Sequence, residues 1–132
     1  MVSGKKTVLV IVSDTLLRTT ITDKLSQKGF GTLHAADCAE GVALAVGNLP
    51  DLIVFEGSPL SADGISLVKR VRGYDWGRYL PLVVLSSTDE PADLSFVKNG
   101  DGPLFFFHAS PPNGDDIVRE IETRLAGTYP TC

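Results

Sequence analysis

The sequence contains little cysteine, no run of basic residues and no long apolar segment, and each absence argues against a class of protein. Cys38 and Cys132 are not spaced as metal ligands, so free thiols in a reducing cytoplasm are the expected state. A formal net charge of -4 without a basic cluster disfavours nucleic acid and anionic membranes as partners. The longest apolar run is far below the roughly 18 residues that span a bilayer. We therefore expect a cytoplasmic protein that contacts neither nucleic acid nor a membrane.

Signatures of hydrolytic and cofactor-binding enzymes are also missing. The sequence has no G-x-S-x-G elbow, no P-loop and no dinucleotide-binding fingerprint. The segment VSDTLLRTT (12–20) has hydroxyl groups but lacks the glycine expected of a loop that cradles the phosphate of FMN. We expect no enzymatic activity and no cofactor, with weak Mg²⁺ binding at most. An enzyme or flavin protein is the alternative, and flavin colour or phosphatase or esterase turnover would reveal it.

What the sequence does contain is an alternation of apolar runs with amphipathic patterns, in a chain of 132 residues that fits one domain. The expected strands are 7–12, 30–36, 51–56, 80–87 and 103–110, and the expected helices are 15–29, 39–48, 63–73, 89–100 and 115–127. Parallel strands need crossover helices, and five units are too few for a barrel of eight. We expect a flavodoxin-like α/β/α sandwich over residues 1–127, with a tail at 128–132. Its five-stranded parallel sheet should have the order 2-1-3-4-5, with five helices.

Polar side chains gather where the expected strands end. In an open parallel sheet, ligands bind beyond the carboxyl ends of the strands, where the strand order reverses. Ser13 and Asp14 follow the first strand, Glu56 and Ser58 follow the third, and Ser86 follows the fourth. These five residues form the candidate pocket.

Four segments resemble the receiver domain of bacterial two-component response regulators, and the resemblance spans residues 6–126. The segments are SDTLLR (13–18), PDLIVFEGSPLSADG (50–64), LPLVVLSS (80–87) and SPPNGDDIVREI (110–121). They are similar to the start of that family's first helix, its third strand and following loop, its fourth strand, and the approach to its last helix. The resemblance implies a signalling module, with other signalling proteins or an output domain as partners. Homodimer formation is left open.

The sequence departs from the family where the phosphoryl chemistry resides. With Arg18 as the anchor, the family's acidic pair falls on Val12 and Ser13, and its phosphoacceptor aspartate falls on Glu56. Mg²⁺ requires hard oxygen ligands, and phosphoryl transfer to a carboxylate depends on positioning and charge neutralisation. The resemblance therefore implies a pseudo-receiver without a metal site or the usual Mg²⁺-dependent phosphorylation. A receiver that is phosphorylated on a non-standard acid, such as Asp14, is the alternative.

The approach to the last helix departs as well. The family's lysine falls on Ser110 if Pro111 is matched, or on Phe107 if the strand is matched without a gap. In the Pro111 register, Phe107 takes the position of the aromatic that responds to phosphorylation, and Ser86 takes that of the hydroxyl that contacts the phosphoryl group. The alternative is that Ser86 caps a turn and Phe107 belongs to the core.

Two further questions stay open in the sequence. Glu56 either imitates a phosphorylated aspartate, accepting a hydrogen bond from Ser13, Ser86 or backbone N–H groups in the loop, or is a solvated relic without a signalling role. The aromatic segment GYDWGRYLP (73–81) either binds a partner or seals a loop onto the domain.

Overall fold

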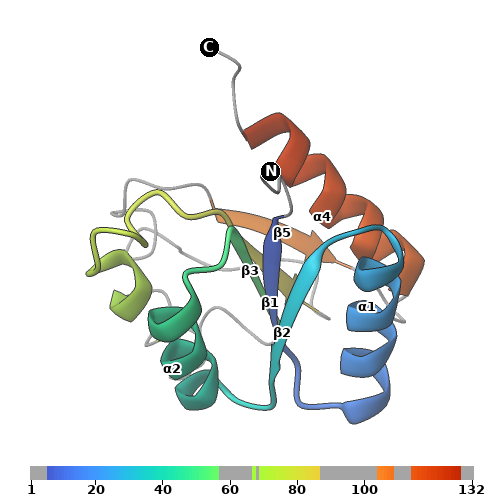
Figure 1. The fold of residues 1–132 in the computed structure, drawn as a ribbon, viewed down its shortest axis with the longest axis horizontal. Helices are drawn as coiled ribbons and strands as arrows, with labels where there is room; N and C mark the ends of the chain where they lie inside the picture. The colour runs from blue at the N-terminus through green and yellow to red at the C-terminus, as the bar shows by residue number, and fades with distance from the viewer. Residues whose placement is uncertain (1–5, 57–66, 68, 87–103, 109–113, 129–132) are drawn as a thin grey trace.

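Five parallel strands form one sheet at the centre of the molecule (Figure 1). The structure is a computed structural model that describes residues 6–56, 67, 69–86, 104–108 and 114–128, and at residues 86, 104–108, 124 and 126–128 it describes the backbone alone. The strands are β1 (Thr7–Ile11), β2 (Gly31–Ala35), β3 (Leu52–Glu56), β4 (Leu82–Ser86) and β5 (Leu104–His108). Their order is β2-β1-β3-β4-β5, which confirms the order expected from the sequence.

The central strands β1 and β3 are apolar on both faces of the sheet, as strands covered on both sides must be. Leu9 and Ile11 of β1 join one core cluster, while Val8, Val10 and Val12 join the other. Residues that alternate along a strand point to opposite faces, so a sheet covered on both sides needs an uninterrupted apolar run. The run TVLVIV satisfies this requirement.

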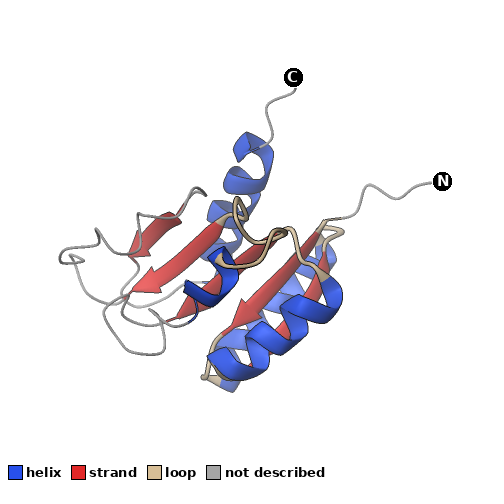
Figure 2. Ribbon diagram, turned by 90° about the vertical axis from the view of Figure 1, so that its left-hand side faces the viewer, coloured by secondary structure: helices blue, strands red, loops and turns tan. Residues whose placement is uncertain are grey.

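Helices cover both faces of the sheet (Figure 2). They are α1 (Thr15–Gln27), α2 (Cys38–Asn48) and α4 (Gly114–Thr128). α1 and α4 lie side by side on one face, and α2 covers the other together with a short helical stretch at 69–72 (Figure 1). Of the helix expected over 63–73, only this stretch and residue 67 are described as helical. The helix expected over 89–100 lies outside the described residues.

The helix limits follow from their capping residues. Asp37 accepts a hydrogen bond from the Glu40 amide at 2.8 Å. The Glu40 carboxylate accepts one in return from the Ala36 amide at 3.1 Å, one residue before the cap. α1 ends at Gln27, two residues before the expected end, and Gly29 follows its C-cap with a φ of 95°, in the left-handed region that favours glycine. The sequence predicted the cap at the start of α2 and the glycine that follows α1.

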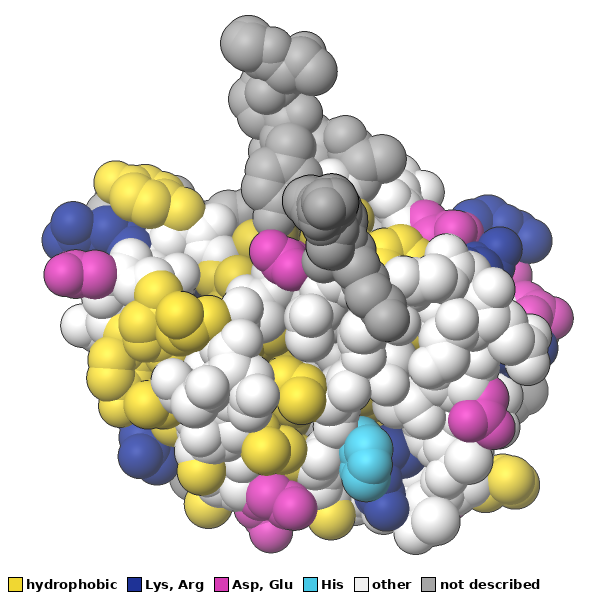
Figure 3. Space-filling view, viewed as in Figure 1, with side chains coloured by type: hydrophobic (Ala, Val, Ile, Leu, Met, Phe, Trp, Pro, Cys, Tyr) yellow, Lys and Arg dark blue, Asp and Glu magenta, His cyan; other side chains and the backbone are white. Residues whose placement is uncertain are grey.

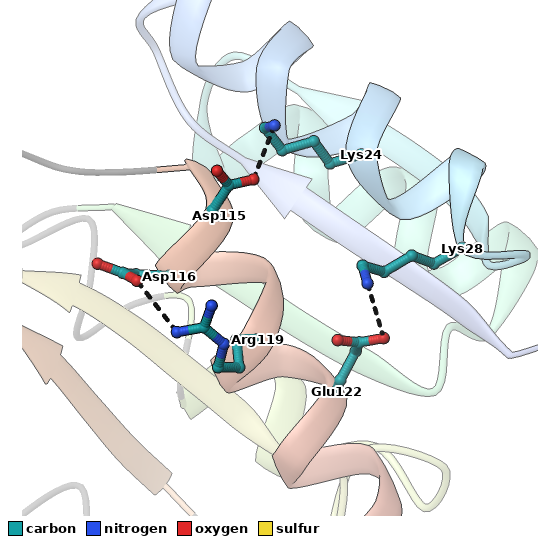
Figure 4. Close-up of polar contacts among 6 residues, drawn as sticks. All are labelled: Lys24, Lys28, Asp115, Asp116, Arg119 and Glu122. Carbon is teal, nitrogen blue, oxygen red and sulfur yellow. Dashed lines mark hydrogen bonds and ion pairs between the residues drawn. The ribbon is translucent and has the colours of Figure 1, made fainter.

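Ion pairs connect the two helices that share a face (Figure 4). Lys24 of α1 lies 2.8 Å from Asp115 of α4, and Lys28 lies 3.6 Å from Glu122. The hydrogen bond and positive charge of Lys24 lower the pKa of the Asp115 carboxyl. The side chains in these pairs are 35–69% exposed, so each pair should contribute little to the stability.

Candidate functional site

Glu56 lies at the carboxyl end of β3, where its side chain is exposed after four buried residues. β1 and β3 are paired in register, with Ile11 opposite Phe55. The residues that follow this pair, including Ser13 after β1 and Glu56 at the end of β3, therefore lie at the same carboxyl end of the sheet. Ser13 donates a hydrogen bond from Oγ to Oε1 of Glu56 at 3.4 Å. This contact is one of those that the sequence suggested for the carboxylate.

Asp14 has a structural task at the same edge. It is the N-cap of α1, and its carboxylate accepts a hydrogen bond from the Leu16 amide at 3.2 Å. An N-cap carboxylate satisfies an amide that has no partner within the helix and interacts favourably with the helix dipole. Capping of α1 is therefore sufficient to explain why an acid is present at position 14.

Val12, which takes the position of one of the family's paired acids, belongs to the core. Its side chain is fully buried, in the cluster that includes Ile21 and Leu25 of α1 and Val118 of α4. A carboxylate at this position, where the family pattern has an acid, would have to fit among hydrocarbon side chains. Burying a charge there is costly unless it is paired.

Arg18 fixes the loop between β1 and α1. Its Nη1 donates to the carbonyl oxygens of Val12 and Ser13 at 2.7 and 3.3 Å, and its Nη2 lies 3.5 Å from Oγ1 of Thr15. The guanidinium thereby holds the backbone from which Ser13 reaches Glu56. The sequence pattern around Arg18 aligned the chain with the family and predicted no contact for this residue. The one signal was its position six residues after Val12, the end of the expected first strand, from which a long side chain can reach back to the strand end.

The structure describes few oxygen donors for a metal ion at this edge. Among the described residues, no group of three or more His, Cys, Asp or Glu side chains is placed to hold a metal. The oxygen donors that the structure brings together are the carboxylate of Glu56 and the hydroxyl of Ser13, with Asp14 engaged as a helix cap. Mg²⁺ is usually held by one or two carboxylates together with further oxygen ligands in octahedral geometry.

The other candidate positions are described only in part. Ser86 ends β4 opposite His108, and Phe107 of β5 is paired with Leu85. Ser86 therefore lies at the carboxyl end of the strand next to β3, and Phe107 lies near the carboxyl end of β5, one strand further away. Ser58 and Ser110 lie outside the described residues.

The aromatic segment after residues 69–72 leads into β4, so it lies at the amino ends of the strands, opposite the end that carries Glu56. Trp76 packs half-buried against the core cluster and stacks on Tyr74, with ring centroids 5.0 Å apart. Arg72 donates to the carbonyl oxygens of Gly77 and Leu80 at 2.9 and 2.6 Å, which holds the turn together. Trp76 thus seals the turn onto the domain, whereas Tyr79 stays 62% exposed.

Among solved structures, receiver domains share this fold. A Francisella response regulator receiver domain is 26% identical, with a TM-score of 0.72, and the match covers 94% of this chain and 99% of that one. The chemotaxis response regulator CheY4 of Vibrio cholerae is 20% identical with a TM-score of 0.77, covering 91% and 98%. The receiver domain of the sensor histidine kinase PA1611 of Pseudomonas aeruginosa is 18% identical with a TM-score of 0.73, covering 94% and 100%. That structure holds a magnesium ion in its active-site cleft.

Sequence comparison gives a set of curated relatives. The Regulator of RpoS from Escherichia coli K12 is 27% identical over 90 residues, which are 68% of this chain and 26% of that protein. The proteins of the same name from Escherichia coli O157:H7 and Shigella flexneri match equally. The chain therefore spans about a quarter of the length of the curated relatives it matches. No protein-family model matches the chain.

Within the described residues, no helix is both long enough and apolar enough to cross a membrane. The strand order, the position of Glu56 at the carboxyl end of β3 and the structural matches all point to the same fold. The chain has the flavodoxin-like fold of a response regulator receiver domain, the kind of module used in two-component signalling.

Proposed function

We propose that this chain is a pseudo-receiver: a signalling module that acts through contacts with other proteins and is not phosphorylated in the usual Mg²⁺-dependent way. The observation that carries the proposal is the pair of residues at the ends of β1 and β3. Glu56 accepts a hydrogen bond from Ser13, and the neighbouring Val12 is buried in hydrocarbon. Phosphoryl transfer to a carboxylate depends on charge neutralisation, for which these residues supply no metal site.

In this proposal, Glu56 acts as a fixed acidic group at the position of the phosphoacceptor. Its carboxylate is one methylene longer than that of aspartate, so the negative charge lies further beyond the end of β3, toward the space that a phosphoryl group on aspartate would occupy. The bond from Ser13 connects it to the β1–α1 loop, and Arg18 holds that loop in place. The domain would then keep one signalling state without a phosphodonor. The simpler alternative is that Glu56 is a relic that sets no state.

The module would work with other signalling proteins or with an output domain. The similarity to the Regulator of RpoS and to receiver domains supports protein partners of this kind. The absence of an enzymatic signature in the sequence is in line with such a role, as is the expected location in the cytoplasm.

Exposure of the chain to a small phosphodonor with Mg²⁺ tests the phosphorylation part of the proposal. We expect intact-mass spectrometry to show no added phosphoryl group. A gain in mass that disappears in Asp14→Asn would support the alternative in which Asp14 is the phosphorylated acid. A gain that disappears in Glu56→Gln would show that Glu56 itself accepts the group, and either gain would overturn the proposal.

The role of Glu56 as a fixed acidic group has its own test. Glu56→Gln removes the charge and nearly preserves the shape, and Asp23→Asn is a control at an exposed site on α1. If Glu56 sets the state, the amide signals of Ser86 and Phe107 should shift in Glu56→Gln and stay unchanged in the control. Shifts confined to Ser13 and the immediate neighbours of Glu56 would favour the relic.

A further inference from the structure

A groove opens at the amino ends of the strands, between the end of α2 and the turn at 73–80. Its volume is about 420 Å³, which suits a small ligand. In Figure 3, hydrophobic side chains gather on the side of the molecule that carries α2 and this turn. The lining of the groove is apolar and aromatic apart from one carboxylate, and it includes Leu49, Pro50, Asp51, Trp76, Tyr79 and Pro81.

The aromatic walls of the groove come from the turn. Trp76 packs half-buried against the core cluster and stacks on Tyr74, so its indole ring is held in place. Tyr79 is 62% exposed, so its ring is accessible from solvent. The faces of aromatic rings carry partial negative charge and attract cations, and the rings also offer apolar contact area. These walls therefore favour a ligand that combines an apolar part with a positive charge.

Leu49 lines the groove from the end of α2, at a cost in backbone strain. It is the C-cap of the helix, with a φ of 50°, in the left-handed region that glycine adopts without strain. Its side chain is 55% exposed and forms part of the groove wall. The leucine thus adds apolar contact area to the groove at a position where the helix end alone would favour glycine.

Asp51 supplies the negative charge of the groove. Its Oδ2 accepts a hydrogen bond from the Thr7 amide at 2.8 Å, which fixes the carboxylate beside the start of β1. Within the part of the chain that the structure describes, no side chain bonds to this carboxylate or forms an ion pair with it. The other charged residues of the turn, Asp75 and Arg78, are exposed and do not line the groove. Oδ1 of Asp51 is therefore available to a donor that enters the groove.

We propose that this groove binds an organic cation, namely an ammonium group carried on an apolar stem. The ammonium group lies at Asp51, and the stem lies against Trp76, Tyr79 and Leu49. A carboxylate with an available oxygen gives an ammonium group both a counter-charge and a hydrogen-bond acceptor. An anion would meet the charge of Asp51 with no cation in the lining to offset it. The site is at the opposite end of the sheet from Glu56 and does not depend on the state of that residue.

Trp76 fluorescence tests the proposal, because the chain contains no other tryptophan and the emission therefore reports on the groove. Titration with n-hexylammonium chloride should give a saturable change in emission. 1-Hexanol has the same stem without the charge and should bind at least about fivefold more weakly, as the loss of one charge contact in water predicts. A capped lysine amide carries the same ammonium group on a peptide. Tighter binding of hexylammonium would identify a free amine as the ligand, and tighter binding of the lysine would identify a side chain of a partner protein.

Three variants separate the roles of the groove residues. Asp51→Asn keeps an acceptor for the Thr7 amide but removes the charge, so it should weaken hexylammonium binding at least about fivefold and leave hexanol binding unchanged. Tyr79→Ala should weaken the binding of both ligands. Asp75→Asn removes the same charge from the turn outside the groove lining and should bind as the wild type does. Unchanged circular dichroism in all three variants would show that the fold is intact.

Two results would overturn the proposal. One is the absence of a saturable change in emission up to about 10 mM hexylammonium, a concentration above which binding is too weak to be specific. The other is an equal loss of affinity in Asp51→Asn and Asp75→Asn, or no loss in either, because the charge inside the groove would then have no special role.

Discussion

Val12 shows how one residue can remove a metal-binding group from the carboxyl end of a sheet while the fold stays the same. Its side chain is fully buried between the sheet and α1, although the family pattern has an acid at that position. The apolar run 7–12 predicted that Val12 belongs to a strand buried on both faces, whereas the cluster that Val12 joins with Ile21 and Leu25 depends on how α1 packs over the end of β1. The same limit applies to Arg18, whose bonds to two backbone carbonyls depend on the path of the loop.

Restoring the acid at this position should therefore destabilise the protein. We expect Val12→Asp to lower the free energy of unfolding by about 2–4 kcal/mol, because the new carboxylate has no partner among the hydrocarbon side chains. Ser13→Asp adds the same group at an exposed neighbour and should cost less than about 1 kcal/mol. Urea unfolding measures both changes. Equal stability of the two variants would contradict the placement of Val12 in the core.

Most elements could be predicted at the scale of helices and strands, because local patterns define them. The apolar run of β3, the capping residues of α2 and Gly29 at the end of α1 each leave a signal within a few residues. The contacts between elements left no such signal. The pair between Lys24 and Asp115 joins residues 91 positions apart, and only the packing of α1 on α4 brings them together.

The turn at 73–80 supplies a prediction at this scale. A Cβ on Gly77 would lie 2.1 Å from the carbonyl oxygen of Val71, so the backbone would have to move. We expect Gly77→Ala to lower the free energy of unfolding by about 1–3 kcal/mol. Gly47 of α2 has open space around it, and Gly47→Ala should raise the same quantity by about 0.5–1 kcal/mol through helix propensity. Urea midpoints that fall equally in both variants would contradict this account of the turn.

The pair between α1 and α4 should make stability depend on pH. The pKa of Asp115 is lowered in the folded protein, chiefly by the hydrogen bond from Lys24. The folded state therefore gains stability above the pKa of the unfolded carboxyl, and this gain is lost as the pH falls through the folded pKa. Asp115→Asn should remove this part of the acid dependence of urea unfolding. The difference from the wild type should shrink at high salt, which screens exposed charges, and a difference independent of pH would contradict the assignment.

At the scale of the whole molecule, the sequence predicted the architecture better than the site. Alternating apolar runs and amphipathic helices permit few arrangements, and the strand order β2-β1-β3-β4-β5 is the one expected. The resemblance also placed Glu56 at the correct edge. It could not show that Ser13 contacts this carboxylate, that Asp14 caps a helix, or that Asp51 lines an aromatic groove.

The most direct test of the central claim is a titration of the chain with Mg²⁺ and a phosphoryl analogue, followed by NMR. The account predicts no saturable shift in the amide signals of Ser13, Asp14, Glu56 or Ser86, because the described carboxylates at this edge do not form a metal site. Ser13→Asp combined with Glu56→Asp restores two of the family's acids and is the matched comparison for weak binding. Saturable shifts at these amides in the wild-type chain would contradict the account and restore phosphorylation as the function of this edge.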